Sequence, residues 1–367
     1  IVKTELIFGA LDEGTFRFCS IEILQQDDFV IRVSCTQTSK KLTKVAITSD
    51  RSKHGEEPAT AEEQEGLRSS VGGLMWVSRS CRPGVSYQVS TLQTAVNKPF
   101  VEDVLLCNKT VQYVQETADK GMIFRSGLCW PSPGDVPMST GHAGGDAPKS
   151  TGHANLGDDS KYTEHSLSPS ICIIACTDAS HGGEDEWLDE WQEREPFRSQ
   201  GAKLIFIADT SILEGDEAFV HLVSFSSTAQ KRVVSSTMKA ESYQLQDVVE
   251  AADLIRAAIA DAHGALDHKD WEQSAASWCK SLWLTDCKSC RDRLHKPVAK
   301  DIDKRPGIEL ASLRQFLWRR RYQDLPDRHL LEELPPIDER TDLCRWIDTT
   351  VMACDCLTKT MREDYLL

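Results

Sequence analysis

Short apolar runs alternate with longer amphipathic segments in the second half of the chain, and their order limits the folds it can adopt. Three short apolar runs come first, and a long segment at 236–263 follows, with apolar residues at helical spacing. Strands are predicted at 171–177, 202–208, 220–226, 281–284 and 343–347, and helices at 236–263, 308–320 and 354–361. Three meandering strands followed by alternating helices and strands predict an α/β fold, in which helices pack on a mixed five-stranded sheet.

The first 125 residues have a different pattern, which is mainly helical. Helices are predicted at 61–81, 85–96 and 99–118. The sequence R-P-G at 82–84 separates the first two of these helices. Before them, residues 16–35 predict a short β-hairpin that turns at Asp27-Asp28.

A stretch rich in Gly, Pro, Ser and His separates the two patterns at 126–170. The sequence S-T-G-H-A occurs twice within it, which is typical of a low-complexity segment. We therefore expect two domains, at 1–125 and 171–367, joined by this linker.

The charge and the cysteines restrict the class of protein. The chain has 367 residues and a net charge of −15, which argues against a broad basic surface that grips nucleic acid. Part of the acidity is local, at 183–195, and is interpreted as a solvated insertion. No stretch is apolar enough to predict a membrane span. The 13 cysteines are irregularly spaced, which predicts reduced thiols in an intracellular protein, either cytoplasmic or nuclear.

Four carboxylates stand at the ends of expected strands or near the starts of expected helices. They are Asp178, Glu241, Asp286 and Asp355. A mixed sheet could bring such positions together, and clustered carboxylates repel one another unless a cation lies between them. Oxygen ligands suit Mg²⁺, and a pair of such ions suits phosphodiester hydrolysis. Each acid taken alone could equally be a turn residue or a helix N-cap, so the hypothesis depends on their convergence.

The order of these acids resembles that of ribonuclease H, and their flanking sequences resemble copia-type retrotransposon Pol polyproteins. The segments that carry the resemblance are T-D-A-S at 177–180, S-S-T-M-K-A-E-S-Y at 235–243 and D-C-L-T-K at 355–359. In the first half, V-G-G-L-M-W at 71–76 and the segment 99–124 resemble the end of a reverse transcriptase. The resemblance implies a ribonuclease H-like domain at 171–367. Before it, residues 1–125 would be the palm end and a thumb- or connection-like part of a reverse transcriptase.

The resemblance also implies an activity, its cofactor and its partners. The four acids would hold two Mg²⁺ or Mn²⁺ ions and hydrolyse the RNA strand of an RNA–DNA hybrid. Upstream reverse transcriptase and integrase parts of the same polyprotein would be partners. Lys231 and Arg232, in Q-K-R-V-V-S-S at 230–236, match a family segment and are candidates to bind nucleic acid, although a solvated turn fits them equally.

The chain also departs from the family pattern. The polymerase motif Y-x-D-D does not occur, and the sequence begins without Met, so we expect a fragment of a larger precursor that is not a polymerase as it stands. The neighbours of Asp286, D-C-K-S-C at 286–290, differ from the family's D-N-x-x-A. Two alternatives to the nuclease therefore stay open. One is a catalytically inactive relic, and the other is a nucleic-acid-binding or interaction module on the same scaffold.

Overall fold

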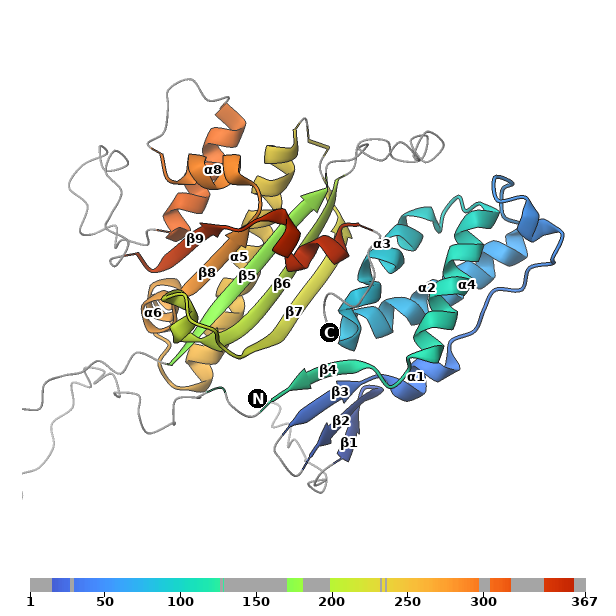
Figure 1. The fold of residues 1–367 in the computed structure, drawn as a ribbon, viewed down its shortest axis with the longest axis horizontal. Helices are drawn as coiled ribbons and strands as arrows, with labels where there is room; N and C mark the ends of the chain where they lie inside the picture. Colours follow the sequence, from blue (N-terminus) through green and yellow to red (C-terminus); the bar gives the residue numbers. More distant parts are fainter. Residues whose placement is uncertain are drawn as a thin grey trace, which may run out of the picture.

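The computed structural model places two β-sheets, each with its own helices, in the chain (Figure 1). The residues that it describes are 15–26, 30–125, 128, 170–180, 199–231, 233, 234, 236–296, 304–317 and 340–359. The expected linker lies outside this part of the chain, apart from Leu128 and Ser170. The acidic insertion at 183–195, the Asp27-Asp28 turn and Arg232 also lie outside it.

The first sheet is antiparallel and has four strands. They are β1 (Thr15–Phe18), β2 (Ile21–Gln25), β3 (Ile31–Ser34) and β4 (Gly121–Phe124), paired in that order. The expected division of 16–35 into two strands was wrong, because this segment forms three. Cys19 and Ser20 adopt φ angles of 48° and 66°, which form a tight left-handed turn between β1 and β2.

Four helices lie between β3 and β4, and the last three of them share one apolar core. They are α1 (Thr36–Lys41), α2 (Ala61–Cys81), α3 (Ser86–Ala95) and α4 (Val101–Glu116). The last three confirm the predicted helices. A capping box starts α2, since Thr60 and Glu63 each accept the other's backbone N–H. The short helix η2 (Pro83–Val85) separates α2 from α3, as the R-P-G sequence predicted.

The second sheet is mixed and has the five strands that the sequence predicted. They are β5 (Ile171–Ser180), β6 (Gln200–Asp209), β7 (Val220–Ala229), β8 (Ser281–Thr285) and β9 (Asp342–Trp346). The spatial order is β7-β6-β5-β8-β9. β6 runs antiparallel to both of its neighbours, β5 and β7, whereas β8 and β9 run parallel to β5. This topology is consistent with a ribonuclease H-like fold.

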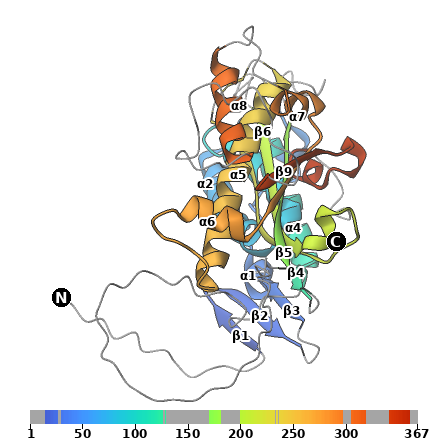
Figure 2. The same cartoon turned by 90° about the vertical axis from the view of Figure 1, so that its left-hand side faces the viewer.

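The two faces of this sheet are covered differently (Figure 2). One face packs against α5 (Thr237–Ala262), α7 (Lys288–Leu294) and α8 (Lys304–Leu317), and α6 (Trp271–Trp278) packs on α5. The opposite face packs against η8 (Ala353–Leu357), and α3 of the first region also contacts it at β7. The central strand β5 is therefore buried on both sides.

One local prediction in this region was wrong, and two helices were missed. The described part of the segment expected to be a helix at 354–361 forms the short 3₁₀ turn η8 instead, and a second 3₁₀ turn, η7 (Thr349–Val351), precedes it. No helix was predicted between 263 and 281, but this segment contains α6. The short helix α7 was also missed. No helix in the described part of the chain is both long and apolar enough to cross a membrane.

Candidate metal centre

Three of the four predicted acids meet at one end of the second sheet. Asp178 lies near the end of β5, Asp286 directly follows β8, and Asp355 lies in η8. β5 and β8 are parallel neighbours with Thr177 opposite Thr285, so the next residue of each strand reaches the same edge. One carboxylate oxygen from each of the three acids lies within 4.8 Å of the other two.

Neighbouring hydroxyl groups orient these carboxylates. The Thr358 hydroxyl donates to Oδ2 of Asp178 and also lies 3.3 Å from the backbone carbonyl oxygen of Asp355. The Thr349 hydroxyl donates to Oδ2 of Asp286 at 2.9 Å. The segment that follows β9 therefore supplies one acid and the hydroxyl groups that position the other two.

Glu241 approaches the same cluster from α5. Its Oε1 accepts the backbone N–H of Ala179 at 3.1 Å, which places it beside Asp178. The residue is only 3% exposed, and Oε2 has no hydrogen-bond partner among the described residues. A buried carboxylate oxygen without a partner is costly, and a bound cation would satisfy it.

Burial and mutual repulsion make Asp178 and Asp286 hard to ionise. Burial raises the pKa of Asp178 to about 7, and the charges of Asp286 and Asp355 add to this rise. The bond from Thr358 and the charge of Lys359 act in the opposite direction. Burial likewise raises the pKa of Asp286, with a contribution from Asp355. The site therefore favours either bound protons or a bound cation.

The pKa of Glu241 is raised well above its ordinary value for the same reasons. Burial is the main cause, followed by the charges of Asp178 and Asp286, and the N–H of Ala179 offsets only part of the rise. The four predicted acids thus belong to one electrostatic unit, although three of them form the closest group.

One cation from the chain touches the cluster. The Lys359 Nζ lies 3.2 Å from Oδ1 of Asp355, and its side chain is 49% exposed. Burial alone would lower the pKa of Lys359, but the charge of Asp178 and the hydrogen bond to Asp355 outweigh it and raise the pKa. A single lysine at the rim does not balance four carboxylates.

The donor set suits a hard divalent cation. All four side chains offer carboxylate oxygens, the ligands that Mg²⁺ and Mn²⁺ prefer. Among the residues that the structure describes, the three aspartates are the one group of three or more His, Cys, Asp or Glu that could hold an ion. The residues present therefore fit the predicted metal.

The two candidate nucleic-acid contacts are less well defined. Lys231 follows β7 and lines an open groove with Gln230 of the same segment and with Tyr243 and Gln244 of α5. Arg232 lies outside the described residues. Lys231 does not belong to the group of the three aspartates.

Sequence reasoning missed Thr358, Lys359 and Thr349. The first two belong to the D-C-L-T-K segment, and their spacing of three and four residues from Asp355 could have indicated a shared turn. Thr349 had no local signal, because its contact with Asp286 depends on the pairing of β8 with β9.

Comparisons with known proteins give limited information. No protein-family model and no curated protein match the chain. A similar solved structure is that of LC11-RNase H1, isolated from compost by a metagenomic approach. The two chains are 12% identical, and the match covers 53% of this chain and 99% of that one with a TM-score of 0.27. This TM-score is too low to establish a relationship, so the fold assignment depends on the strand order alone.

Proposed function

We propose that the protein is a metal-dependent ribonuclease of the ribonuclease H type, which hydrolyses the RNA strand of RNA–DNA hybrids. One observation carries this proposal. One carboxylate oxygen each from Asp178, Asp286 and Asp355 lies within 4.8 Å of the other two. Among the described residues, Lys359 at the rim is the one cation that pairs with any of these three acids. Two Mg²⁺ or Mn²⁺ ions would supply an activated water and stabilise the leaving 3′ oxygen when bound.

The residues of the chain have distinct roles in this proposal. Asp178 would be the central metal ligand, because it is the most buried of the three aspartates and lies beside Glu241. Asp286 and Asp355 complete the ligand set from either side. Glu241 presents an unpartnered Oε2, which can serve a metal ion or the 2′-hydroxyl that distinguishes RNA from DNA.

The proposal extends to the origin of the chain. The sequence segments around the acids support descent from a copia-type Pol polyprotein, with reverse transcriptase and integrase parts as partners. We assign 1–125 to the end of the reverse transcriptase, 126–170 to a linker and 171–367 to the ribonuclease H-like domain.

Cleavage of a labelled hybrid tests the activity. The full chain with Mg²⁺ should cut only the RNA strand of an RNA–DNA hybrid and leave duplex DNA intact, and chelation of the metal should stop the reaction. Asp178→Asn should abolish cleavage, because it removes the central ligand while preserving the side-chain size. Asp247→Asn is the matched control, since Asp247 pairs with Lys203 at the surface of α5. Cleavage that survives in Asp178→Asn contradicts the proposal.

The contact between Lys359 and Asp355 favours a second candidate, a catalytically inactive relic on the same scaffold. The lysine already supplies one positive charge to the cluster and could stand in for a metal ion. Calorimetric titration with Mg²⁺ separates the two candidates. The nuclease predicts metal binding by the native chain, whereas the relic predicts no binding in the native chain and weak binding after Lys359→Ala.

A further inference from the structure

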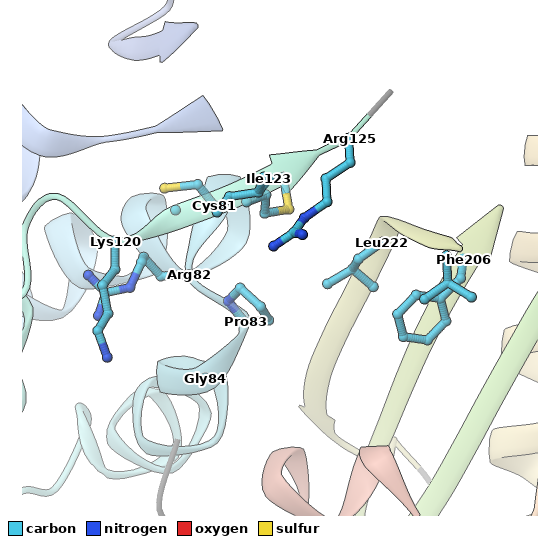
Figure 3. A pocket seen from close by; sticks show the side chains of 12 residues that line it. Cys81, Arg82, Pro83, Gly84, Lys120, Ile123, Arg125, Phe206 and Leu222 are labelled. Carbon is cyan, nitrogen blue, oxygen red and sulfur yellow. The ribbon is translucent and has the colours of Figure 1, made fainter. Parts of the chain in front are cut away.

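A pocket of about 290 Å³ lies between the first helical region and the second sheet (Figure 3). Its walls come from three places. They are residues 81–84 at the end of α2, residues 120–123 and 125 around β4, and Phe206, Val220 and Leu222 of β6 and β7. Its volume lies near the lower end of the range for small-molecule sites.

The charge of this pocket differs from that of the rest of the chain. Its lining includes Arg82, Lys120 and Arg125 and contains no Asp or Glu. The chain as a whole has 57 acidic and 42 basic residues, so a lining with three cations and no acid is unusual for it. Such a lining produces a locally positive potential that attracts anions.

The three cations are held in different ways. Arg82 donates to the carbonyl and the hydroxyl of Thr117, both at 2.8 Å, so it forms part of the wall. The side chains of Lys120 and Arg125 make no ion pair or hydrogen bond with any described residue, and Figure 3 shows Arg125 extending toward the space between Pro83 and Leu222. These two cations are available to a ligand.

The position of Arg125 is nevertheless defined. Its backbone N–H donates to Nε2 of His221 at 3.2 Å, and the ring of Phe124 meets that of His221 edge-on at 5.7 Å. These contacts join the end of β4 to β7. The Arg125 side chain therefore leaves a fixed point of the backbone beside the pocket.

The opposite wall is apolar and includes an aromatic ring. Phe206 and Leu222 are cross-strand partners on β6 and β7, and both side chains are half-buried. Aromatic side chains stack with nucleic-acid bases without regard to sequence, while nearby cations bind the phosphates. We infer that the pocket binds a nucleotide unit, with its phosphate at Arg125 and its base against Phe206, while Lys120 adds to the positive potential of the pocket from beyond Pro83.

This site is separate from the metal centre. Asp178 pairs with Ala202 on β6, and Phe206 lies four residues further along the same strand. At about 3.3 Å per residue, the aromatic wall lies roughly 13 Å from the register position of Asp178. A nucleotide in this pocket would therefore occupy a site distinct from that of the scissile phosphate.

Fluorescence anisotropy with a short fluorescein-labelled oligothymidylate tests the inference. EDTA is present throughout, so failure to bind here says nothing about metal-dependent cleavage. The native chain should bind the probe, and the double variant Lys120→Ala, Arg125→Ala should bind it about tenfold more weakly. Lys109→Ala is the matched control, because Lys109 is an exposed lysine of α4 outside the pocket. Equal affinity of the native and double-variant chains overturns the inference.

A second variant tests the aromatic wall. Phe206→Leu should weaken binding while the salt dependence stays unchanged, whereas loss of the two cations should reduce the salt slope by about one. Competition with thymidine monophosphate identifies the source of the nucleotide. If thymidine monophosphate displaces the probe, the ligand is a free nucleotide. If only an unlabelled strand displaces it, the ligand is a single-stranded nucleic acid. Unchanged affinity in Phe206→Leu contradicts the placement of the base.

Discussion

Two buried clusters of carboxylates lie in the same α/β region, and they differ in whether the chain itself supplies a buried counter-ion. In the first cluster, Arg256 of α5 lies between Asp253 and Asp342 and is 1% exposed. Its Nη1 is 2.6 Å from Oδ1 of Asp342, and its Nη2 contacts Asp253. Burial alone would lower the pKa of Arg256, but the charges of the two aspartates outweigh it and raise the pKa.

Among the described residues, the second cluster, around Asp178, has no such internal cation. Four carboxylates converge there, and Lys359 contacts them from a half-exposed position. The comparison shows what a structural charge cluster requires, which is a counter-ion supplied by the fold itself. A cluster that lacks one stores unfavourable electrostatic energy unless protons or metal ions bind to it.

Removal of the internal cation should have the largest effect. Arg256→Met removes the buried arginine that pairs with both Asp253 and Asp342, and it should lower the free energy of unfolding by about 3–5 kcal/mol. Urea denaturation followed by circular dichroism measures the change. The triple variant that also carries Asp253→Asn and Asp342→Asn should recover part of the loss. If Arg256→Met lowers the free energy of unfolding by less than about 1 kcal/mol, the first cluster does not depend on Arg256 to balance its buried charges.

The second cluster should respond to pH in the absence of divalent cations. An unfolded aspartate has a pKa near 3.8, whereas burial raises the pKa of folded Asp178 to about 7. Between these values the folded state holds a proton that the unfolded state has released, so the stability decreases as the pH rises through this window. The loss should reach at most about 4 kcal/mol by pH 7 and above.

Denaturation curves recorded with EDTA between about pH 3 and about pH 8, which extend about one unit beyond the window at each end, measure this loss. Asp178→Asn should flatten the profile, because the amide does not titrate. Asp247→Asn, at the surface pair with Lys203, should leave the profile unchanged. A native chain whose stability increases across the same window would show that the carboxylates repel one another less than their burial implies.

Divalent cations should reverse the destabilisation. Mg²⁺ at a hundredfold excess over its dissociation constant should add about 2.7 kcal/mol to the free energy of unfolding near neutral pH, because it binds the folded state alone. Thermal melts across a Mg²⁺ titration measure the gain. The gain should disappear in Asp178→Asn and in Asp286→Asn, and it should persist in Arg256→Met, if that variant folds. An equal gain in all variants would place the ion elsewhere.

Local sequence patterns predicted much of the scaffold behind this comparison. Apolar spacing predicted the five strands and α5, because burial against a sheet or a helix leaves a periodic signal. The positions of Asp178 and Asp286 followed from the ends of neighbouring strands. The helix expected at Asp355 was wrong, because burial of η8 against the sheet stabilises a tighter turn there.

Contacts between distant segments left no comparable signal. Arg256 meets Asp342 across 86 positions of the chain, and Thr349 meets Asp286 across 63. No local pattern marks such pairs, so the counter-ion that distinguishes the two clusters was missed. The turn at Cys19-Ser20 was missed because neither residue is the Gly or Asn that usually marks positive φ angles.

The smallest expected effect concerns the link between the first helical region and the acid cluster. Gln200 of β6 donates to Oγ of Ser90 in α3 at 3.0 Å and to Oγ of Ser227 in β7 at 2.7 Å. Ser227 in turn donates to the carbonyl of Leu357 at 2.5 Å. Leu357 precedes Thr358, whose hydroxyl binds Asp178. A chain of hydrogen bonds therefore connects α3 to the residue that orients the central carboxylate.

Ser227→Ala breaks this chain and should cost about 1 kcal/mol of stability, as expected for one buried hydrogen bond. Ser224→Ala is the matched control, because Ser224 lies on the same strand and makes no side-chain hydrogen bond with any described residue. If the link also positions Thr358, Ser227→Ala should weaken Mg²⁺ binding in calorimetric titrations, while Ser224→Ala should not. Lower stability with unchanged Mg²⁺ affinity would mean that α3 supports the sheet without influencing the acids. The hydroxyl groups of the segment that follows β9 would then orient Asp178 and Asp286 without a contribution from α3.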